Sequence, residues 1–303
     1  MGQKGSWNEK SKYIKRNWQL YLFFMLPPFL LLLIFKYAPM GGILIAFEDY
    51  SAIQGIFGSA WVGLKHFQRF LTSPDVMNYL GSTLKVSLYG MLWSFPVPIL
   101  LALLLNRIQR QGLKKKIQLL VYAPNFISVI VLCGMVRIFL SPIGPINGLF
   151  GINTNWMTMP LAFRTIYIAS GIWQTVGWSS ILYTAALSNA SQELTEAAIV
   201  DGATIFQQIK HVDLPAIKDI VVIQFILAAG NIMSIGFEKA YALQTDLNLP
   251  ASEILSTYVY KIGLLNGDYS YSTAVGVFNS VINVILLILV NQVVKKLNDG
   301  RGI

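Results

Sequence analysis

The feature that most constrains this chain is the spacing of its charged residues. Charged residues make up only 12% of the 303 residues and hydrophobic residues 54%, whereas a soluble domain carries roughly 25% charged residues. A spanning helix needs about 20 apolar residues to cross the hydrocarbon core of a bilayer. Six charge-free stretches approach or exceed that length: 17–35, 86–106, 117–136, 165–192, 220–237 and 269–294. The sequence therefore predicts an all-α integral membrane protein with six transmembrane helices.

A further charge-free stretch, 138–163, is predicted to be an external loop. Its core, SPIGPINGLFGINTNWMTMP, is rich in Pro, Gly and Asn, and irregular backbone in lipid leaves polar groups without partners. Six spans place both termini on the same side of the membrane. Most of the 23 Lys and Arg residues fall in cytoplasmic segments if the N-terminus is inside, so the positive-inside rule predicts that both termini are cytoplasmic.

The predicted organisation is one membrane domain with two short cytoplasmic tails. Residues 1–16 form a basic N-terminal tail, residues 17–294 form the six-helix domain, and residues 295–303 form the C-terminal tail. The formal net charge of +9 is then mainly an orientation signal. A nucleic-acid partner is not expected, because the basic residues form no platform with interleaved aromatic side chains.

The predicted cytoplasmic loop 188–218 differs from the basic inner segments. Between residues 188 and 215 it holds four acidic residues and one lysine. A helix is favoured before Gly202, which can end it in a left-handed conformation. Thr204 and Gln207 have the spacing of a capping box for a second helix, which Pro215 is expected to stop. Such an element either docks into a groove of another protein or lies along the lipid headgroups.

The same loop resembles the EAA signature of ATP-binding-cassette (ABC) importer permeases. The matching pattern is Glu196-Ala197-Ala198, three residues, Gly202, nine residues, Val212, one residue and Leu214-Pro215, with valine in place of the usual isoleucine. Other segments are similar to the carbohydrate-uptake branch of these permeases, and most similar to its polysaccharide-type subfamily, which includes alginate importer subunits. They are KYAPM (36–40), IAFEDY, GSAWVGLKHF, STYVYKIGL and YSYSTAVGVFNSVINVILL. The resemblance implies the type I ABC importer permease fold.

The resemblance also implies a transport subunit that has no catalytic residues and no cofactor of its own. Such a subunit moves an oligosaccharide or polysaccharide across the bacterial cytoplasmic membrane by alternating access. Its implied partners are membrane lipid, a second homologous permease, two ATP-binding subunits that hold ATP and magnesium, and an extracytoplasmic substrate-binding protein. ATPase coupling is assigned to the matching loop positions: Glu196, Ala197, Ala198, Asp201, Gly202, Leu214 and Pro215.

A path for sugars is expected to hold aromatic rings and uncharged polar groups within the membrane. The helices that flank the loop and the last helix supply the candidates Trp173, Gln174, Thr175, Trp178, Asn231, Asn279 and Asn283, with Gln224, Ser234 and Ser280 in the same helices. Each polar candidate can instead bond a neighbouring helix, and Trp also suits the membrane interface. Arg137 and Arg164, near outer helix ends, either reach lipid headgroups or face an anionic sugar.

Two other classes of protein fit the sequence less well. A secondary transporter requires intramembrane carboxylates or a broken-helix ion site, and no Asp or Glu lies centrally in the six predicted spans. An intramembrane enzyme requires a metal cluster or a nucleophile–base pair. His66 and His211 fall on opposite predicted sides, and Cys133 is the single cysteine, so no metal site is predicted. A permease of the same architecture for another solute is the remaining alternative.

Overall fold

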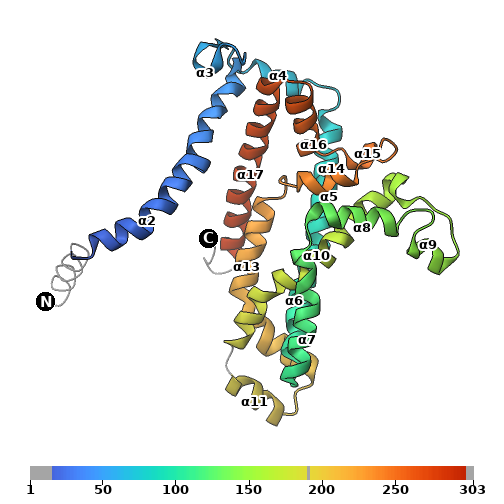
Figure 1. Ribbon diagram of the computed structural model, residues 1–303. Coiled ribbons are helices and arrows are strands. Elements are labelled where there is room, and N and C mark those ends of the chain that lie inside the picture. The colour runs from blue at the N-terminus through green and yellow to red at the C-terminus, as the bar shows by residue number, and fades with distance from the viewer. Residues whose placement is uncertain (1–15, 190–191, 298–303) are drawn as a thin grey trace.

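The computed structural model describes residues 16–189 and 192–297 of the chain. The predicted N-terminal tail except Arg16, and the C-terminal tail beyond residue 297, lie outside the described residues. The described part is mostly helical, and its long helices run roughly side by side between two ends of the molecule (Figure 1). One end carries α3 and α4, and the opposite end carries α11.

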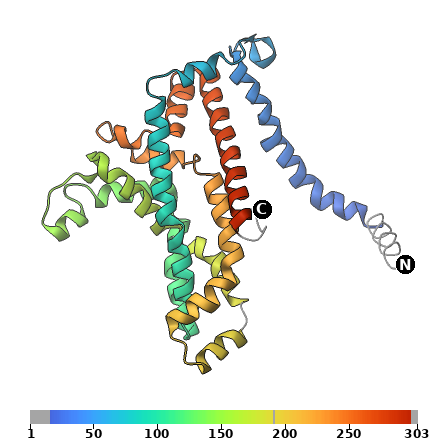
Figure 2. The ribbon, with the colours of Figure 1, turned by 180° about the vertical axis from the view of Figure 1, so that it is seen from behind.

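The N-terminal helix α2, Trp18–Leu32, stands away from the other helices in both views (Figures 1 and 2). It continues through a π-helical segment, Leu33–Tyr37, and a 3-10 segment, Ala38–Phe47. None of the α2 side chains is buried. A helix that is apolar on all sides requires lipid or another protein around it.

A short outer segment connects α2 to the bundle. It contains the strands β1, Glu48–Asp49, and β2, Ala60–Trp61, which pair antiparallel. Helix α3, Gly55–Gly58, lies between the two strands, and α4, Lys65–Leu71, follows them. Arg69 of α4 pairs with Asp268 just before the last helix, with 2.7 Å between Nη1 and Oδ2. This ion pair fixes the outer segment onto the bundle.

The next two helices form one long apolar stretch. Helix α5, Val76–Ser94, runs into α6, Pro96–Asn106, and together they are long and apolar enough to cross a membrane. The predicted span 86–106 is therefore part of a longer helical stretch that begins ten residues earlier. The earlier turns contain Lys85, so they are not part of the charge-free stretch that predicts the span.

The predicted helix 117–136 is wrong as a continuous element, because the structure divides it. Helix α7, Gln111–Tyr122, ends in a 3-10 turn, Ala123–Phe126, and α8, Val129–Phe139, leaves at 99° to it. Pro124 lacks a backbone donor. Ser128 then caps α8 by accepting a hydrogen bond from the Val131 backbone N–H at 3.3 Å. Proline and cap together favour two helices over one.

The predicted external loop 138–163 contains short helices and is anchored by one buried side chain. These helices are α9, Pro145–Phe150, and a 3-10 turn, Trp156–Thr158. Asn147 is fully buried and donates through Nδ2 to the carbonyl of Thr154 at 2.6 Å. Its Oδ1 accepts a hydrogen bond from Trp156 Nε1 at 2.8 Å. The side chain of this one asparagine forms hydrogen bonds with later residues of the loop, and these bonds stabilise the irregular backbone.

Helix α10, Pro160–Ser188, is the central helix of the bundle and packs against α5, α6, α7 and α13. A Cβ atom on Gly177 would lie 2.0 Å from the carbonyl oxygen of Val121 in α7. Only glycine permits this close approach of the two helix backbones. The buried residues Ile99, Leu103, Tyr183 and Ile217 form a core between α6, α10 and α13.

The remaining chain forms the inner loop and the second half of the bundle. Its elements are α11 (Gln192–Val200), α12 (Ile205–Gln208), a π-helical segment (Ile209–Asp213), α13 (Leu214–Gly230), α14 (Phe237–Leu243), α15 (Leu249–Ser252), α16 (Leu255–Tyr260), a π-helical segment (Lys261–Leu265) and α17 (Tyr269–Leu297). At the outer end, Phe70, Leu255, Tyr271 and Val275 form a second core between α4, α16 and α17.

Within the described residues, three helical stretches have the length and hydropathy of a membrane span: Trp18–Phe47, Val76–Asn106 and Tyr269–Lys296. The bent pair formed by α7 and α8 meets the same requirement jointly. The predicted span 165–192 corresponds largely to α10, which does not meet this requirement. The predicted span 220–237 is wrong in its last part, because α13 ends at Gly230 and is too short to meet the requirement. Central α10 is more polar because protein, rather than lipid, surrounds much of it. The structure thus identifies a mostly helical membrane protein with three or four clear spans.

Candidate functional site

Helix α11 carries the first half of the EAA pattern, and Gly202 ends it. Gly202 has a φ of +74°, in the left-handed region. Its N–H donates to the Ile199 carbonyl at 3.0 Å, and the Ala203 N–H donates to the Ala198 carbonyl at 2.9 Å. These two bonds form a Schellman motif. The predicted helix and glycine turn are confirmed, and a Cβ on Gly202 would meet no atom within 4 Å, so backbone conformation alone requires the glycine.

The second half of the pattern begins at the predicted cap. Thr204 Oγ1 accepts a hydrogen bond from the Gln207 N–H, and Gln207 Oε1 accepts one from the Thr204 N–H at 2.7 Å. The capping box is therefore confirmed. The prediction that Pro215 stops this helix is wrong, because α12 continues through a π-helical segment into α13. Inside a regular helix, proline is unfavourable because it lacks a backbone N–H and its ring clashes with the preceding turn. The wider π turn immediately before Pro215 places this residue in the first turn of α13, where both features are tolerated.

A buried ion pair fixes this segment to the bundle. Arg107, just after α6, pairs through Nη2 with Asp213 Oδ2, and the Asp213 side chain is 3% exposed. Arg107 Nη1 also donates to Gln208 Oε1 at 2.6 Å, and Gln208 Nε2 donates to the Ala203 carbonyl at 2.8 Å. One guanidinium thus joins the end of α6 to both sides of the α12 turn.

The α11–α12 hairpin presents an apolar surface at its tip. Val200 is 86% exposed and Phe206 75% exposed, and Leu194, Ile199 and Ile205 are also exposed. The hairpin projects beyond the ends of the long helices (Figure 1). The matching residues Glu196, Ala197, Asp201 and Gly202 are exposed as well, while Ala198 is half-buried. An exposed apolar surface on a rigid, anchored element is typical of a protein-binding site.

A second feature is a groove between α5, α6, α10 and α13. Two adjoining cavities of about 350 and 300 Å³ share Ser94, Phe95 and Ala228 in their walls. Trp178 and Gln224 line the smaller cavity, and Asn231 and Ser234 line the larger one. The Ser87 hydroxyl, also in the wall of the larger cavity, is buried and bonds no described residue. The groove therefore combines an indole ring with uncharged polar groups.

The other sequence-predicted path residues are not brought to this groove. Gln174 is buried and donates through Nε2 to the Ile127 carbonyl at 2.8 Å, at the break between α7 and α8. Asn283 accepts from the Met233 N–H at 3.1 Å and donates to Ser234 Oγ at 2.9 Å, just beyond α13. In both cases a side-chain amide satisfies backbone where a helix is interrupted.

The three remaining candidates lie elsewhere on α10 and α17. Thr175 donates to the Gly171 carbonyl of its own helix at 2.9 Å. Trp173 is half-exposed and contributes to neither cavity of the groove. The buried Asn279 Oδ1 bonds no described residue. Among the described residues, no group of three or more His, Cys, Asp or Glu side chains could hold a metal ion.

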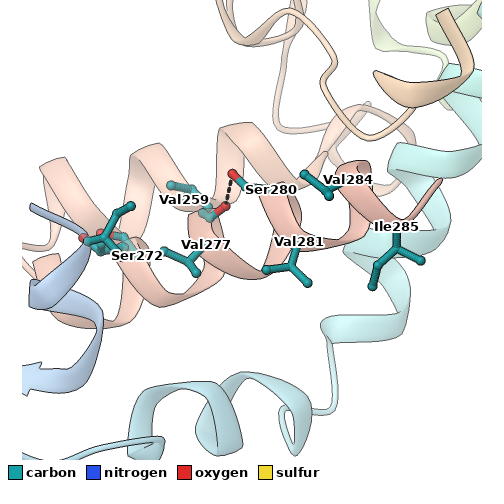
Figure 3. A pocket seen from close by; sticks show the side chains of 10 residues that line it. Val259, Ser272, Val277, Ser280, Val281, Val284 and Ile285 are labelled. Atoms are coloured by element: carbon teal, nitrogen blue, oxygen red, sulfur yellow. Dashed lines mark hydrogen bonds between the residues drawn. The ribbon is translucent and has the colours of Figure 1, made fainter. Parts of the chain in front are cut away.

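A third cavity, of about 710 Å³, lies along α17 and has mainly apolar walls. Figure 3 shows Val277, Val281, Val284 and Ile285 along this helix, with Ser272 and Ser280 among them. The Ser280 hydroxyl donates to the Gly276 carbonyl of its own helix at 3.0 Å, so it offers little to a polar ligand. This surface suits lipid or an apolar helix rather than a sugar.

Comparison with known proteins identifies the family. Residues 94–299, which include the inner hairpin and the groove walls formed by α6, α10 and α13, match the binding-protein-dependent transport system inner membrane component family. The chain belongs to this family. It is therefore an inner-membrane transport subunit, and members of the family do not themselves catalyse a reaction. The EAA resemblance in the sequence is confirmed as a family relationship.

Relatives of this transport family cover nearly the whole chain. The polygalacturonan/rhamnogalacturonan transport system permease protein YteP of Bacillus subtilis (strain 168) is 43% identical over 296 residues, which is 96% of this chain and 92% of that protein. A chain of the crystal structure of a bacterial ABC transporter involved in the import of the acidic polysaccharide alginate is 34% identical, with a TM-score of 0.85. The match covers 96% of this chain and 99% of that chain.

A second solved structure is similar to the same extent. It is described as the bacterial alginate ABC transporter in complex with an alginate pentasaccharide-bound periplasmic protein. Its matching chain is 35% identical, with a TM-score of 0.85, over 96% of this chain and 99% of that chain.

The role of Arg107 was not predicted, because in the sequence it is only one of the basic residues that indicate which side of the membrane is cytoplasmic. The available signal was Asp213, an acid in an apolar context next to Leu214-Pro215. A buried carboxylate requires a cationic partner, and the nearest inner-loop arginine follows an apolar helix. Ser87 was not predicted either, because serine within a membrane helix usually bonds its own backbone.

Proposed function

We propose that the chain is the permease subunit of an ATP-driven ABC importer that carries oligosaccharides or polysaccharides across the bacterial cytoplasmic membrane by alternating access. The observation that carries the proposal is the anchored α11–α12 hairpin, which follows the EAA pattern and exposes apolar side chains. The relatives support the substrate class, because YteP is described as transporting polygalacturonan and rhamnogalacturonan and the similar solved structures import alginate.

In this proposal the hairpin docks into a cleft of an ATP-binding subunit. Its contact and turn residues are Glu196, Ala197, Ala198, Asp201, Gly202, Leu214 and Pro215. ATP and magnesium are held by two such partner subunits and not by this chain. Closure of the ATPase pair displaces the hairpin, and Arg107 passes that displacement to α6 while the continuous helix passes it to α13. ATP drives the change because it binds more tightly to one arrangement of the complex than to the other.

The membrane domain is proposed to span residues 17–294 with six helices and both termini cytoplasmic. Helices α10 and α13 are the two spans beyond those that meet the length and hydropathy requirement. A second homologous permease completes the bundle. Helix α2 supports this, because its side chains are mostly apolar and none of them is buried against the rest of the described chain. An extracytoplasmic binding protein delivers the sugar to the end that carries α3 and α4.

The groove beside α10 is the proposed sugar path. Trp178 offers a flat ring for a pyranose face, and Asn231, Gln224 and Ser87 offer bonds to hydroxyl groups. Gln174 and Asn283, whose amides bond the backbone of other segments, support the walls of this path. Trp173, Thr175 and Asn279 lie outside the proposed path.

The test is ATP-dependent uptake by the complete transporter in proteoliposomes. The chain, the second homologous permease, the ATPase and the binding protein are reconstituted together and given a panel of labelled oligosaccharides and amino acids. Uptake of one or more saccharides, with matching stimulation of ATP hydrolysis, is the expected result. Uptake without ATP, driven by a proton or sodium gradient, would contradict the proposal in favour of a secondary transporter.

A further inference from the structure

The outer half of the bundle contains a polar cavity that is distinct from the groove beside Trp178. It has a volume of about 560 Å³, within the roughly 300–1,000 Å³ range of small-molecule sites. Its walls come from the start of α5, the start of α10 and the segment that runs through α15. Because α5 follows α4, the cavity lies toward the end of the molecule opposite α11 (Figures 1 and 2).

Two cations face this cavity, and neither has an ion-pair partner among the described residues. Lys85 of α5 and Arg164 of α10 both line it. Within the described ranges, neither side chain lies within 4.0 Å of a carboxylate oxygen. The Nε atom of Arg164 is shielded from solvent and has no hydrogen-bond partner there. A guanidinium with unused donors in a cavity is suited to an anionic ligand, especially a carboxylate.

The acidic residues of the cavity exclude a simple inorganic anion as its best ligand. Asp75, Asp246 and Glu253 share the walls with the two cations. Glu253 is already paired, because it accepts from Lys261 Nζ at 2.5 Å and from Thr257 Oγ1 at 2.9 Å. Asp75 and Asp246 are left to repel a phosphate or sulfate ion. Both carboxylates instead accept hydrogen bonds well from hydroxyl groups.

The cavity wall around α15 is preorganised. Asn248 is fully buried and donates through Nδ2 to the carbonyls of Met157 at 2.8 Å and Leu243 at 3.1 Å. Its Oδ1 accepts from the Thr245 N–H at 3.0 Å and from Ser252 Oγ at 2.7 Å. The segment that carries Asp246 and Glu253 is therefore fixed before any ligand arrives, which reduces the entropic cost of binding.

We infer that this cavity is an entry subsite for a uronic acid unit of an oligosaccharide, with Arg164 and Lys85 binding the carboxylate and Asp75 and Asp246 binding hydroxyl groups. A uronic acid carries both kinds of group, so it satisfies the cations and the acids together. This inference rests on the proposed function and adds the charge of the substrate and the place where it enters.

The test uses the complete transporter in proteoliposomes with a saturating concentration of sugar-loaded binding protein. The two probes are trigalacturonate and its methyl ester, which keeps the hydroxyl groups but has no charge. Arg164→Gln and Lys85→Gln are each expected to lower trigalacturonate import about tenfold, the size of one lost charge-assisted contact. Import of the methyl ester is expected to stay within about twofold. Arg164→Lys is expected to recover part of the loss, because it keeps the positive charge.

The controls separate the subsite from the proposed function. Arg137→Gln removes another outer cation, one that lies outside the cavity and donates to the Gln244 carbonyl, and it is expected to affect both probes equally. Asp246→Asn is expected to slow import of both probes, because it weakens contacts with hydroxyl groups. Equal loss of both probes in Arg164→Gln, or no loss of either, would overturn the subsite alone. A wild-type complex that hydrolyses ATP but imports no saccharide would contradict the proposed function itself.

Discussion

The inner hairpin and the groove beside Trp178 differ in how their residues come together. In the hairpin, the Schellman motif at Gly202 and the capping box at Thr204 connect residues within five positions of each other. In the groove, the walls come from the continuous stretch α5–α6 and from α10 and α13, three regions that are far apart in the sequence. A function that depends on local backbone geometry leaves a readable spacing in the sequence, whereas one that depends on helix packing does not.

The largest expected effect tests the buried ion pair that joins the hairpin to α6. Arg107→Ala leaves the carboxylate of Asp213 buried without its cationic partner, which costs about 3–5 kcal/mol. We expect a large fall in the thermal unfolding midpoint of the purified complex and loss of sugar-stimulated ATP hydrolysis. Arg110→Ala, which removes a nearby exposed arginine, is the matched control and is expected to leave both measurements unchanged.

A double variant shows whether the loss comes from the unpaired charge. Arg107→Met combined with Asp213→Leu replaces the ion pair by apolar side chains of similar size, a change that is often neutral for stability. The double variant is expected to recover most of the unfolding midpoint. If it is as unstable as Arg107→Ala, the hydrogen bond from Arg107 to Gln208 is the more important contact.

A smaller effect is expected at the glycine turn, where the contacts are local. Gly202→Val forces a β-branched residue into left-handed backbone, at a cost of about 1–2 kcal/mol. Sugar-stimulated ATP hydrolysis is expected to fall about tenfold, while the amount of chain in the membrane stays the same. Gly202→Asn is the control, because asparagine tolerates this conformation. An equal loss in both variants would mean that side-chain bulk at the docking surface matters more than the turn.

The two regions also show how far the sequence predicts this structure. The helix, the glycine turn and the capped second helix were predictable, since each depends on residues that are near neighbours in the chain. The continuation through Pro215 was not, because a π turn compensates for the proline and no residue pattern indicates it. Gln174 was correctly placed within a helix. Its bond to the Ile127 carbonyl depends on a break in another helix, which the sequence of α10 does not contain.

The smallest of these effects is expected in the groove, where several helices share the contacts with a ligand. Trp178→Ala removes one ring from the cavity wall, and stacking of such a ring contributes about 1 kcal/mol, so the rate of sugar import is expected to fall about fivefold. Trp173→Ala removes an equally large and similarly exposed indole five residues earlier on α10, outside the groove. It is expected to change import less than twofold. If Trp173→Ala lowers import more than Trp178→Ala does, the sugar path lies on the Trp173 side of α10. Each variant removes one indole ring from the same helix, and the two differ only in the direction that the ring faces.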